Sequence, residues 1–132
     1  MSQENVDRMR AAMEAFNRRD GAGFDGLLAG DAEIVPVRAA VEGTVYRGSN
    51  AGSQYCAAVN QSWVGLRWEV EDVRDGECWV LALGRIRGQG RDSGAAIDAK
   101  AGWLAHFHEG VMTRFQTYAN RAEALEAAGL SE

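Results

Sequence analysis

The chain reads AIDAKAGWLAHFH from Ala96 to His108, and its successive side chains alternate between two faces. One face carries Ile97, Ala99, Ala101, Trp103, Ala105 and Phe107, and the other carries Asp98, Lys100, Gly102, Leu104, His106 and His108. A period of two residues is typical of a β-strand that is buried on one side. Because alanines fill the middle of the apolar face, we expect empty space above this part of the sheet, and we interpret that space as a ligand pocket.

Length and composition fit one globular domain over residues 1–132. The net charge is −5, from 19 acidic and 14 basic residues. Nucleic acids and anionic membranes bind concentrated basic surfaces, so we expect neither as a partner. No apolar run reaches the ~20 residues of a membrane span, and the N-terminus lacks the pattern of a secretion signal. We therefore expect a cytoplasmic protein in which Cys56 and Cys78 are reduced and buried.

The first half of the chain predicts three helices and one short strand. The first helix covers residues 4–19, with apolar positions at helical spacing: Val6, Met9, Met13 and Phe16. A short second helix, closed by Gly30, contains Phe24, Leu27 and Leu28. Residues 31–37 predict a strand in which Pro36 marks an edge or an end, and residues 38–48 predict a loop. A third helix, capped by Ser49 or Asn50, carries Tyr55, Val59 and Trp63 on one stripe.

The second half predicts four longer strands and a final helix. Asp75-Gly76, the glycine-rich residues 88–94 and Glu109-Gly110 are typical of hairpin turns between strands. Asn120 with Glu123 begins the last helix, and Gly129 ends it. This order predicts an α+β fold in which a curved antiparallel sheet wraps around helices, as a cone with an internal pocket.

Four short motifs support the same architecture. They are residues 14–20 (EAFNRRD), 46–48 (YRG), 88–94 (GQGRDSG) and 118–130 (YANRAEALEAAGL). In this order the chain resembles the SnoaL-like branch of the nuclear transport factor 2-like superfamily over nearly its whole length. The resemblance implies a cone-shaped, cystatin-like roll. It does not imply one activity, because the superfamily includes polyketide cyclases, ketosteroid isomerases, epoxide hydrolases, dehydratases and members without catalysis.

Two mechanisms of the superfamily lack their acids in this chain. Ketosteroid isomerases would need a carboxylate base near Val35-Pro36 and a second acid near Trp103, and neither is present. Limonene epoxide hydrolases would need an aspartate near Thr117 and an arginine–aspartate pair within residues 80–84, which read VLALG.

A resemblance to polyketide cyclases asks for less, namely one acid or base above a wide pocket. The candidates are Glu33, Asp72, Tyr46 and Arg114. We favour solvent-exposed positions for Glu33 and Asp72 and a structural ion pair for Arg114, so the catalytic residue stays unassigned.

The outward face of the 96–108 strand raises the question of a metal or a partner. His106 and His108 share that face, but the next candidate ligand, Asp98, lies over ~25 Å from His106 along a strand. We therefore expect no metal and no cofactor, and place the histidines in solvent or at a subunit contact. The same face is expected to carry Leu104, Trp79, Leu81 and Leu83. This apolar surface predicts a homodimer through the outer sheet face, as the family resemblance also implies.

Inward positions predict the lining of the ligand pocket. The predicted residues are Phe16, Tyr55, Val59, Trp63, Trp68, Ala101, Trp103, Phe107, Phe115 and Thr117. Large rings beside small residues would enclose a hydrophobic, flat small molecule, although ordinary core packing also explains an aromatic stripe. The chain is then either a cofactor-free enzyme of the cyclase, isomerase or hydratase kind, or a non-catalytic ligand-binding or dimerisation module. On this view Ala101→Trp abolishes ligand binding and destabilises the fold less than a substitution of Met13.

Overall fold

The computed structural model describes residues 2–37 and 43–130. Its helices are α1 (Ser2–Asn17), α2 (Gly21–Asp25), α4 (Ala51–Ser62) and α5 (Arg121–Ala127). Its strands are β1 (Leu28–Val35), β2 (Tyr46–Arg47), β3 (Trp63–Asp75), β4 (Trp79–Gly90), β5 (Ala96–His108) and β6 (Val111–Tyr118).

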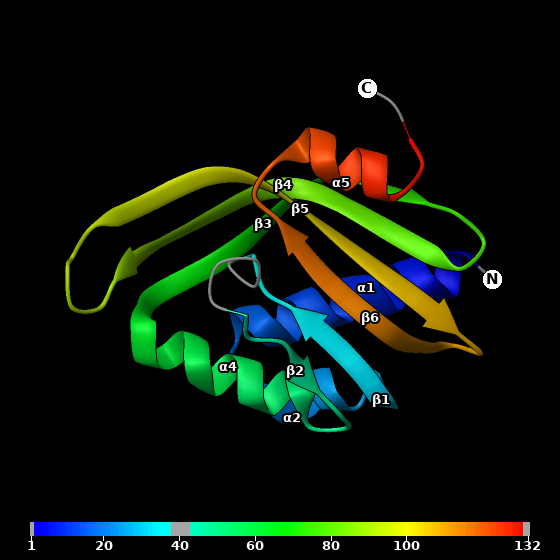
Figure 1. The fold of residues 1–132 in the computed structure, drawn as a ribbon, viewed down its shortest axis with the longest axis horizontal. Helices are drawn as coiled ribbons and strands as arrows, with labels where there is room; N and C mark the ends of the chain where they lie inside the picture. Colours follow the sequence, from blue (N-terminus) through cyan, green and yellow to red (C-terminus); the bar gives the residue numbers. More distant parts are fainter. Residues whose placement is uncertain (1, 38–42, 131–132) are drawn as a thin grey trace.

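Within these residues the strands form one curved six-stranded sheet in the order β2-β1-β6-β5-β4-β3 (Figure 1). Helices α1, α2 and α4 lie on the concave side, and α5 lies on the opposite side (Figure 1). The predicted α+β architecture with a curved sheet is confirmed. Neighbouring strands are antiparallel except β1 and β6, which run parallel.

Several element boundaries differ from the predictions because sheet pairing overrides local spacing. Helix α2 ends at Asp25, and Leu28 already pairs with Met112 of β6, so Gly30 lies inside β1 and does not close a helix. Trp63 is extended and pairs with Gly90 across β3 and β4, so it begins a strand and does not end helix α4. Strand β4 continues through Gly90, which shortens the predicted turn.

Part of the predicted 38–48 loop, residues 38–42, lies outside the described residues. The described remainder holds the short strand β2. Its residues pair with β1, Arg47 opposite Glu33 and Tyr46 opposite Ile34. The predicted loop is therefore wrong at these two positions.

The last helix follows its local signals. The Asn120 side chain accepts hydrogen bonds from the backbone N–H groups of Ala122, at 2.8 Å, and Glu123, at 3.3 Å. Gly129 has a φ of +77°, and the Leu130 N–H donates to the Leu125 carbonyl at 2.8 Å. The predicted capping and the glycine stop are therefore confirmed.

The alanine row on the concave face lies beneath packed side chains. Ala82, Ala101 and Ala105 are no more than 1% exposed, and they belong to one core cluster with Met13 and Phe16 of α1. Small side chains on the sheet thus allow a helix to approach closely. The empty space expected above these alanines is occupied by this packing, and Ala99, farther along β5, is exposed.

Helix α5 covers the apolar part of the outer face. Leu81, Leu83 and Leu104 are no more than 3% exposed and form a second cluster with Ala124 and Leu125. A Cβ at Gly102 would lie 2.5 Å from the Ala124 Cβ, so the glycine is what lets α5 lie flat on β5. The expected apolar surface for a partner sheet is therefore already covered by the chain's own helix.

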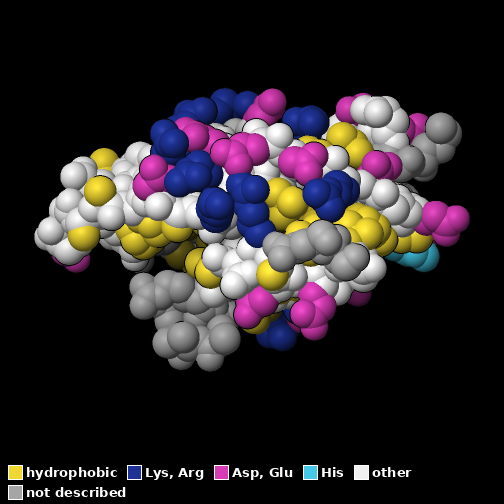
Figure 2. All heavy atoms as spheres, turned by 90° about the horizontal axis from the view of Figure 1, so that it is seen from above, with side chains coloured by type: hydrophobic (Ala, Val, Ile, Leu, Met, Phe, Trp, Pro, Cys, Tyr) yellow, Lys and Arg dark blue, Asp and Glu magenta, His cyan; other side chains and the backbone are white. Residues whose placement is uncertain are grey.

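The rest of the outer face is charged. Asp98 pairs with Arg85 at 2.9 Å and with Arg87 at 3.5 Å, and Arg87 also lies 3.4 Å from Glu69. Figure 2 shows acidic and basic side chains interspersed there. Such exposed pairs contribute little stability individually, but they keep this part of the sheet hydrated.

Cysteines and histidines complete the description of the surface. Cys56 is buried as expected, but Cys78 is exposed because it lies in the turn before β4. His106 and His108 are both exposed, and no group of three possible metal ligands occurs among residues 2–37 and 43–130. In that same part of the chain, no helix has the length and hydrophobicity needed to span a bilayer.

Candidate ligand cavity

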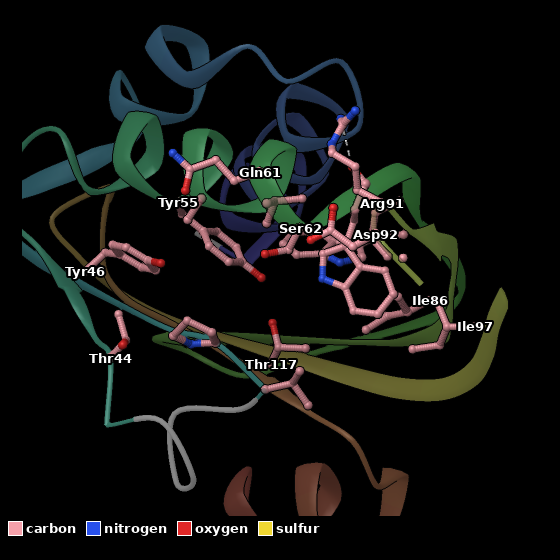
Figure 3. A pocket seen from close by; sticks show the side chains of 18 of the residues that line it. Thr44, Tyr46, Tyr55, Gln61, Ser62, Ile86, Arg91, Asp92, Ile97 and Thr117 are labelled. Carbon is pink, nitrogen blue, oxygen red and sulfur yellow. Dashed lines mark hydrogen bonds between the residues drawn. The ribbon is translucent and has the colours of Figure 1, made fainter. Parts of the chain in front are cut away.

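A cavity of about 440 Å³ lies between α4 and the sheet (Figure 3). On the sheet it borders the beginning of β3, the end of β4 and the beginning of β5. This volume falls in the range of small-molecule sites, roughly 300–1,000 Å³. The residues around it are Pro36, Val37, Thr44, Tyr46, Tyr55, Ala58, Val59, Gln61, Ser62, Trp63, Leu66, Trp68, Ile86, Gly90, Arg91, Asp92, Ser93, Ile97 and Thr117. Most of the wall is aromatic or aliphatic.

The position of α4 is fixed at its N-terminal end by α2. Asp25 accepts hydrogen bonds from the Ser53 N–H, at 3.0 Å, and from the Ser53 hydroxyl. A Cβ at Gly52 would lie 2.8 Å from the Phe24 Cβ, so the two helices touch at this glycine. These contacts place Tyr55, one turn later, above the sheet.

Two arginines hold the other end of α4. Arg19 donates to Asn60 Oδ1 at 3.2 Å and to the Leu66 carbonyl at 2.5 Å, and burial lowers the pKa of its guanidinium. Arg91 donates to the carbonyls of Asn60, at 2.9 Å, and Trp63, at 3.3 Å. The turn between β4 and β5 is thereby tied to the junction of α4 and β3.

Trp68 separates the cavity from the core. Its ring stacks on Phe16 with centroids 3.6 Å apart and lies 5.5 Å from Phe115 and 5.6 Å from Trp103. Asn17 fixes the same residue: its side chain donates to the Trp68 carbonyl at 2.9 Å and accepts from the Trp68 N–H at 2.8 Å. The aromatic cluster therefore gives the cavity a rigid floor.

Two hydroxyl groups are buried at the cavity. Burial raises the pKa of Tyr55, and the Thr117 hydroxyl offsets part of that rise, so Tyr55 stays protonated at neutral pH. Thr117 Oγ1 is shielded from solvent and has no hydrogen-bond partner among the described residues. Asp92, which is exposed, is the one carboxylate in the described part of the wall, and no histidine occurs there. The described interior thus offers hydrogen bonds and aromatic surface.

The ten residues predicted to line the pocket separate into two groups. Those on the cavity wall are Tyr55, Val59, Trp63, Trp68 and Thr117. Those buried within the core are Phe16, Ala101, Trp103, Phe107 and Phe115. All ten are partly or fully buried on the concave side. Helix α1 covers one end of that side, and the second group belongs to the core cluster that contains the buried residues of α1.

Sequence reasoning missed several wall residues, and some had a signal. Ile97 already lies on the inward face of the 96–108 alternation, and Leu66 lies two residues before Trp68, so the same alternation includes both. Ala58 and Ser62 follow Tyr55 at helical spacing on α4. The turn residues around Arg91 had no periodic signal, because only the tertiary fold brings them to α4.

Most of the acid–base candidates lie away from the cavity. Glu33 is 2.8 Å from Arg47 and 3.9 Å from Arg114, and Asp72 is 3.2 Å from Arg74. None of these residues lines the cavity, whereas the fourth candidate, Tyr46, does. All three charged candidates form surface ion pairs, which were expected for Arg114 alone, whereas Glu33 and Asp72 were expected only to be exposed to solvent.

The sequence matches the SnoaL-like domain family over residues 9–115. Among solved structures it is similar to an NTF2-like protein of unknown function from Burkholderia pseudomallei, with 21% identity and a TM-score of 0.78 over 93% of this chain and 95% of that one. It is also similar to a proposed polyketide cyclase from Xanthomonas campestris, with 21% identity and a TM-score of 0.77 over 92% and 93%. A third, TerC co-crystallised with polyporic acid, has 17% identity and a TM-score of 0.76 over 93% and 96%.

No curated protein matches the sequence. At these identities the solved structures show a shared fold and carry no residue roles. The family match covers most of the chain, including α4 and the strands that form the cavity. This chain therefore belongs to the SnoaL-like domain family.

Proposed function

We propose that this chain binds a flat, mostly apolar small molecule in the cavity between α4 and the ends of β3, β4 and β5. The observation that carries the proposal is a hollow of about 440 Å³ beside the buried rings of Tyr55 and Trp68. Rigid aromatic walls favour planar ligands, since ring faces give a large contact area at low entropic cost. The buried hydroxyl groups would orient the ligand.

The structural relatives support this class of ligand. TerC was crystallised with polyporic acid, and the Xanthomonas campestris protein is a proposed polyketide cyclase. Both observations belong to those proteins, which share this fold at low identity. They make aromatic, oxygen-bearing molecules the first compounds to test on this chain.

A second candidate function is cofactor-free acid–base catalysis of the cyclase, isomerase or hydratase kind. It rests on Asp92, the one carboxylate in the described wall. A general base must reach the proton that it removes within hydrogen-bonding distance, roughly 2.6–3.2 Å. The Asp92→Asn variant separates the two functions. We expect its ligand affinity to stay within twofold of wild type. If the wild type turns over an aromatic substrate and Asp92→Asn does not, that result would favour catalysis.

Homodimerisation through the outer sheet face and a cytoplasmic location both stay predictions. Because α5 covers the leucines of that face, a second copy would have to bind a part that α5 leaves open, such as the strip that carries His106, Arg114 and Gln116 beside a hollow of about 280 Å³. Sedimentation of the protein as a monomer at micromolar concentration would contradict the dimer.

The binding proposal is tested by closing the cavity. Ala58 lines it, whereas the neighbouring Ala57 is exposed on α4 and does not. We expect Ala58→Trp to weaken binding of a planar aromatic probe, 2-acetonaphthone, at least tenfold in calorimetric titrations. The matched Ala57→Trp variant should bind like wild type. A wild-type protein that binds no planar aromatic probe, or an Ala58→Trp variant that binds it normally, would contradict the proposal.

A further inference from the structure

We propose that Tyr55 and Thr117 form the polar anchor of this cavity and each donate a hydrogen bond to one carbonyl oxygen of a neutral aromatic ketone or quinone. The inference rests on the proposed function and names the ligand class of the same site. It concerns one end of the cavity, where helix and sheet each contribute a hydroxyl group.

The two hydroxyl groups come from opposite layers of the fold. Tyr55 projects from α4 and Thr117 from β6, and their side chains are 7% and 4% exposed. Figure 3 shows their oxygen atoms directed toward one another at the wall of the cavity. A single ligand atom placed between them could contact both groups.

Thr117 is the observation that points to a ligand. Its Oγ1 is shielded from solvent and makes no hydrogen bond of ordinary length with the described residues, although it lies near enough to the Tyr55 hydroxyl to lower the pKa of that group. Buried hydroxyl groups in folded proteins are nearly always satisfied. Thr113, a half-buried threonine on the same strand, does find a partner and donates to the His106 carbonyl at 3.2 Å. A partner for Thr117 is therefore expected to come from a molecule in the cavity.

The chemistry of the pair favours an acceptor. Because burial raises the pKa of Tyr55, the phenol keeps its proton and acts as a donor. A threonine hydroxyl can also donate, and a carbonyl oxygen has two lone pairs that accept both bonds. A ketone or quinone oxygen therefore matches two donors that converge from two layers.

The surroundings disfavour a charged ligand group at this anchor. Arg91, the one cation in the described wall, already donates to the carbonyls of Asn60 and Trp63, and it points away from the two hydroxyl groups in Figure 3. A carboxylate beside Tyr55 would lose its hydration without gaining a cation. A neutral carbonyl loses much less hydration.

The first test compares three probes of similar shape on the wild-type protein by titration calorimetry. These are 2-acetonaphthone, which has the carbonyl, 2-ethylnaphthalene, which lacks it, and 2-naphthoate, which is charged. We expect the ketone to bind about tenfold more tightly than the hydrocarbon, as two modest hydrogen bonds allow, and the carboxylate to bind most weakly.

The second test removes each hydroxyl group. Tyr55→Phe and Thr117→Val should each weaken ketone binding roughly fivefold and leave hydrocarbon binding unchanged. Tyr118→Phe and Thr113→Val, which alter hydroxyl groups away from the cavity, are the matched controls. The carbonyl stretching frequency of bound 2-acetonaphthone should rise in Tyr55→Phe, because a donor is lost. Thr117→Val should also raise the melting temperature of the free protein.

The outcomes separate this inference from the proposed function. If ketone and hydrocarbon bind the wild type equally, or if both hydroxyl variants bind the ketone normally, the anchor is overturned and the cavity remains a binding site. If 2-naphthoate binds most tightly, the neutral ligand class is overturned. If no probe binds the wild type, the proposed function fails and the anchor fails with it.

Discussion

At the α1 end of the concave face, Ala101 and Ala105 are fully buried in one cluster with Met13 and Phe16. At the α4 end, much larger side chains such as Ile86 border a cavity of about 440 Å³. The end that carries these alanines is filled, and the hollow lies at the other end. A row of small side chains on a strand therefore does not by itself leave a cavity. The distance at which the opposing helix lies decides whether a cavity forms, because a helix can settle closely only on small side chains.

The largest expected effect distinguishes two alanine-to-tryptophan substitutions. Ala101→Trp inserts a large ring into the filled end and should destabilise the protein by at least about 3 kcal/mol. Ala58→Trp places the same ring in the cavity and should cost less than about 1 kcal/mol. Urea denaturation measures both. Equal stabilities would mean that the alanine row is loosely packed, in agreement with the empty space that the sequence predicted above it.

The next comparison truncates two isoleucines. Ile34 is fully buried in the core, whereas Ile86 borders the cavity. We expect Ile34→Ala to cost about 4 kcal/mol and Ile86→Ala about 2 kcal/mol, because the wall of an existing hollow has fewer contacts to lose. Chemical denaturation gives both values. A larger loss for Ile86→Ala would show that the hollow end packs as well as the filled one.

A smaller effect tests the boundary between the two ends. The Asn17 side chain makes two hydrogen bonds with the backbone of Trp68 and so ties α1 to β3. Asn17→Ala should cost about 2 kcal/mol, since it leaves a partly buried N–H and C=O without partners. Gln3→Ala, which removes an exposed contact to Asp7, is the control and should cost less than about 0.5 kcal/mol. Similar losses in the two variants would argue against this tie.

The smallest expected effect extends the comparison to the outer face. Partial burial of the ring, with a contribution from Arg114, lowers the pKa of His106, although the residue as a whole is exposed. The unfolded chain then binds this proton more readily than the folded chain, so stability falls as the pH drops below about 6.5. Melting temperatures at pH 7.5 and 5.5 should differ slightly less in His106→Gln than in wild type, with His108→Gln as the control. An unchanged difference in His106→Gln would contradict this assignment.

Local signals identified much of the fold correctly. The cap at Asn120 and the stop at Gly129 depend on neighbours within a few residues, so the sequence contains all that they require. Alternation from Ala96 to His108 likewise identified β5 with its inner and outer faces. The boundary at Trp63 was missed because helical spacing continues to it, while pairing with Gly90 makes it extended.

The candidate site was only half predictable for the same reason. Tyr55 and Trp68 lie on periodic stripes that point inward, and they were found. Arg91 and Asp92 reach the wall through the turn that joins two long strands, and no local pattern encodes that approach. Cys78 was misplaced because its strand pattern begins just after it, in an exposed turn.

By itself the sequence determined most of the elements, the faces of the long strands and the family to which the chain belongs, because hydrophobic periodicity and capping act over a few residues. Tertiary structure alone decided that α1 closes over the alanine row, that α5 covers the outer leucines and that the hollow lies beneath α4. Those outcomes depend on how closely helices approach the sheet, which is settled by contacts between residues far apart in the chain.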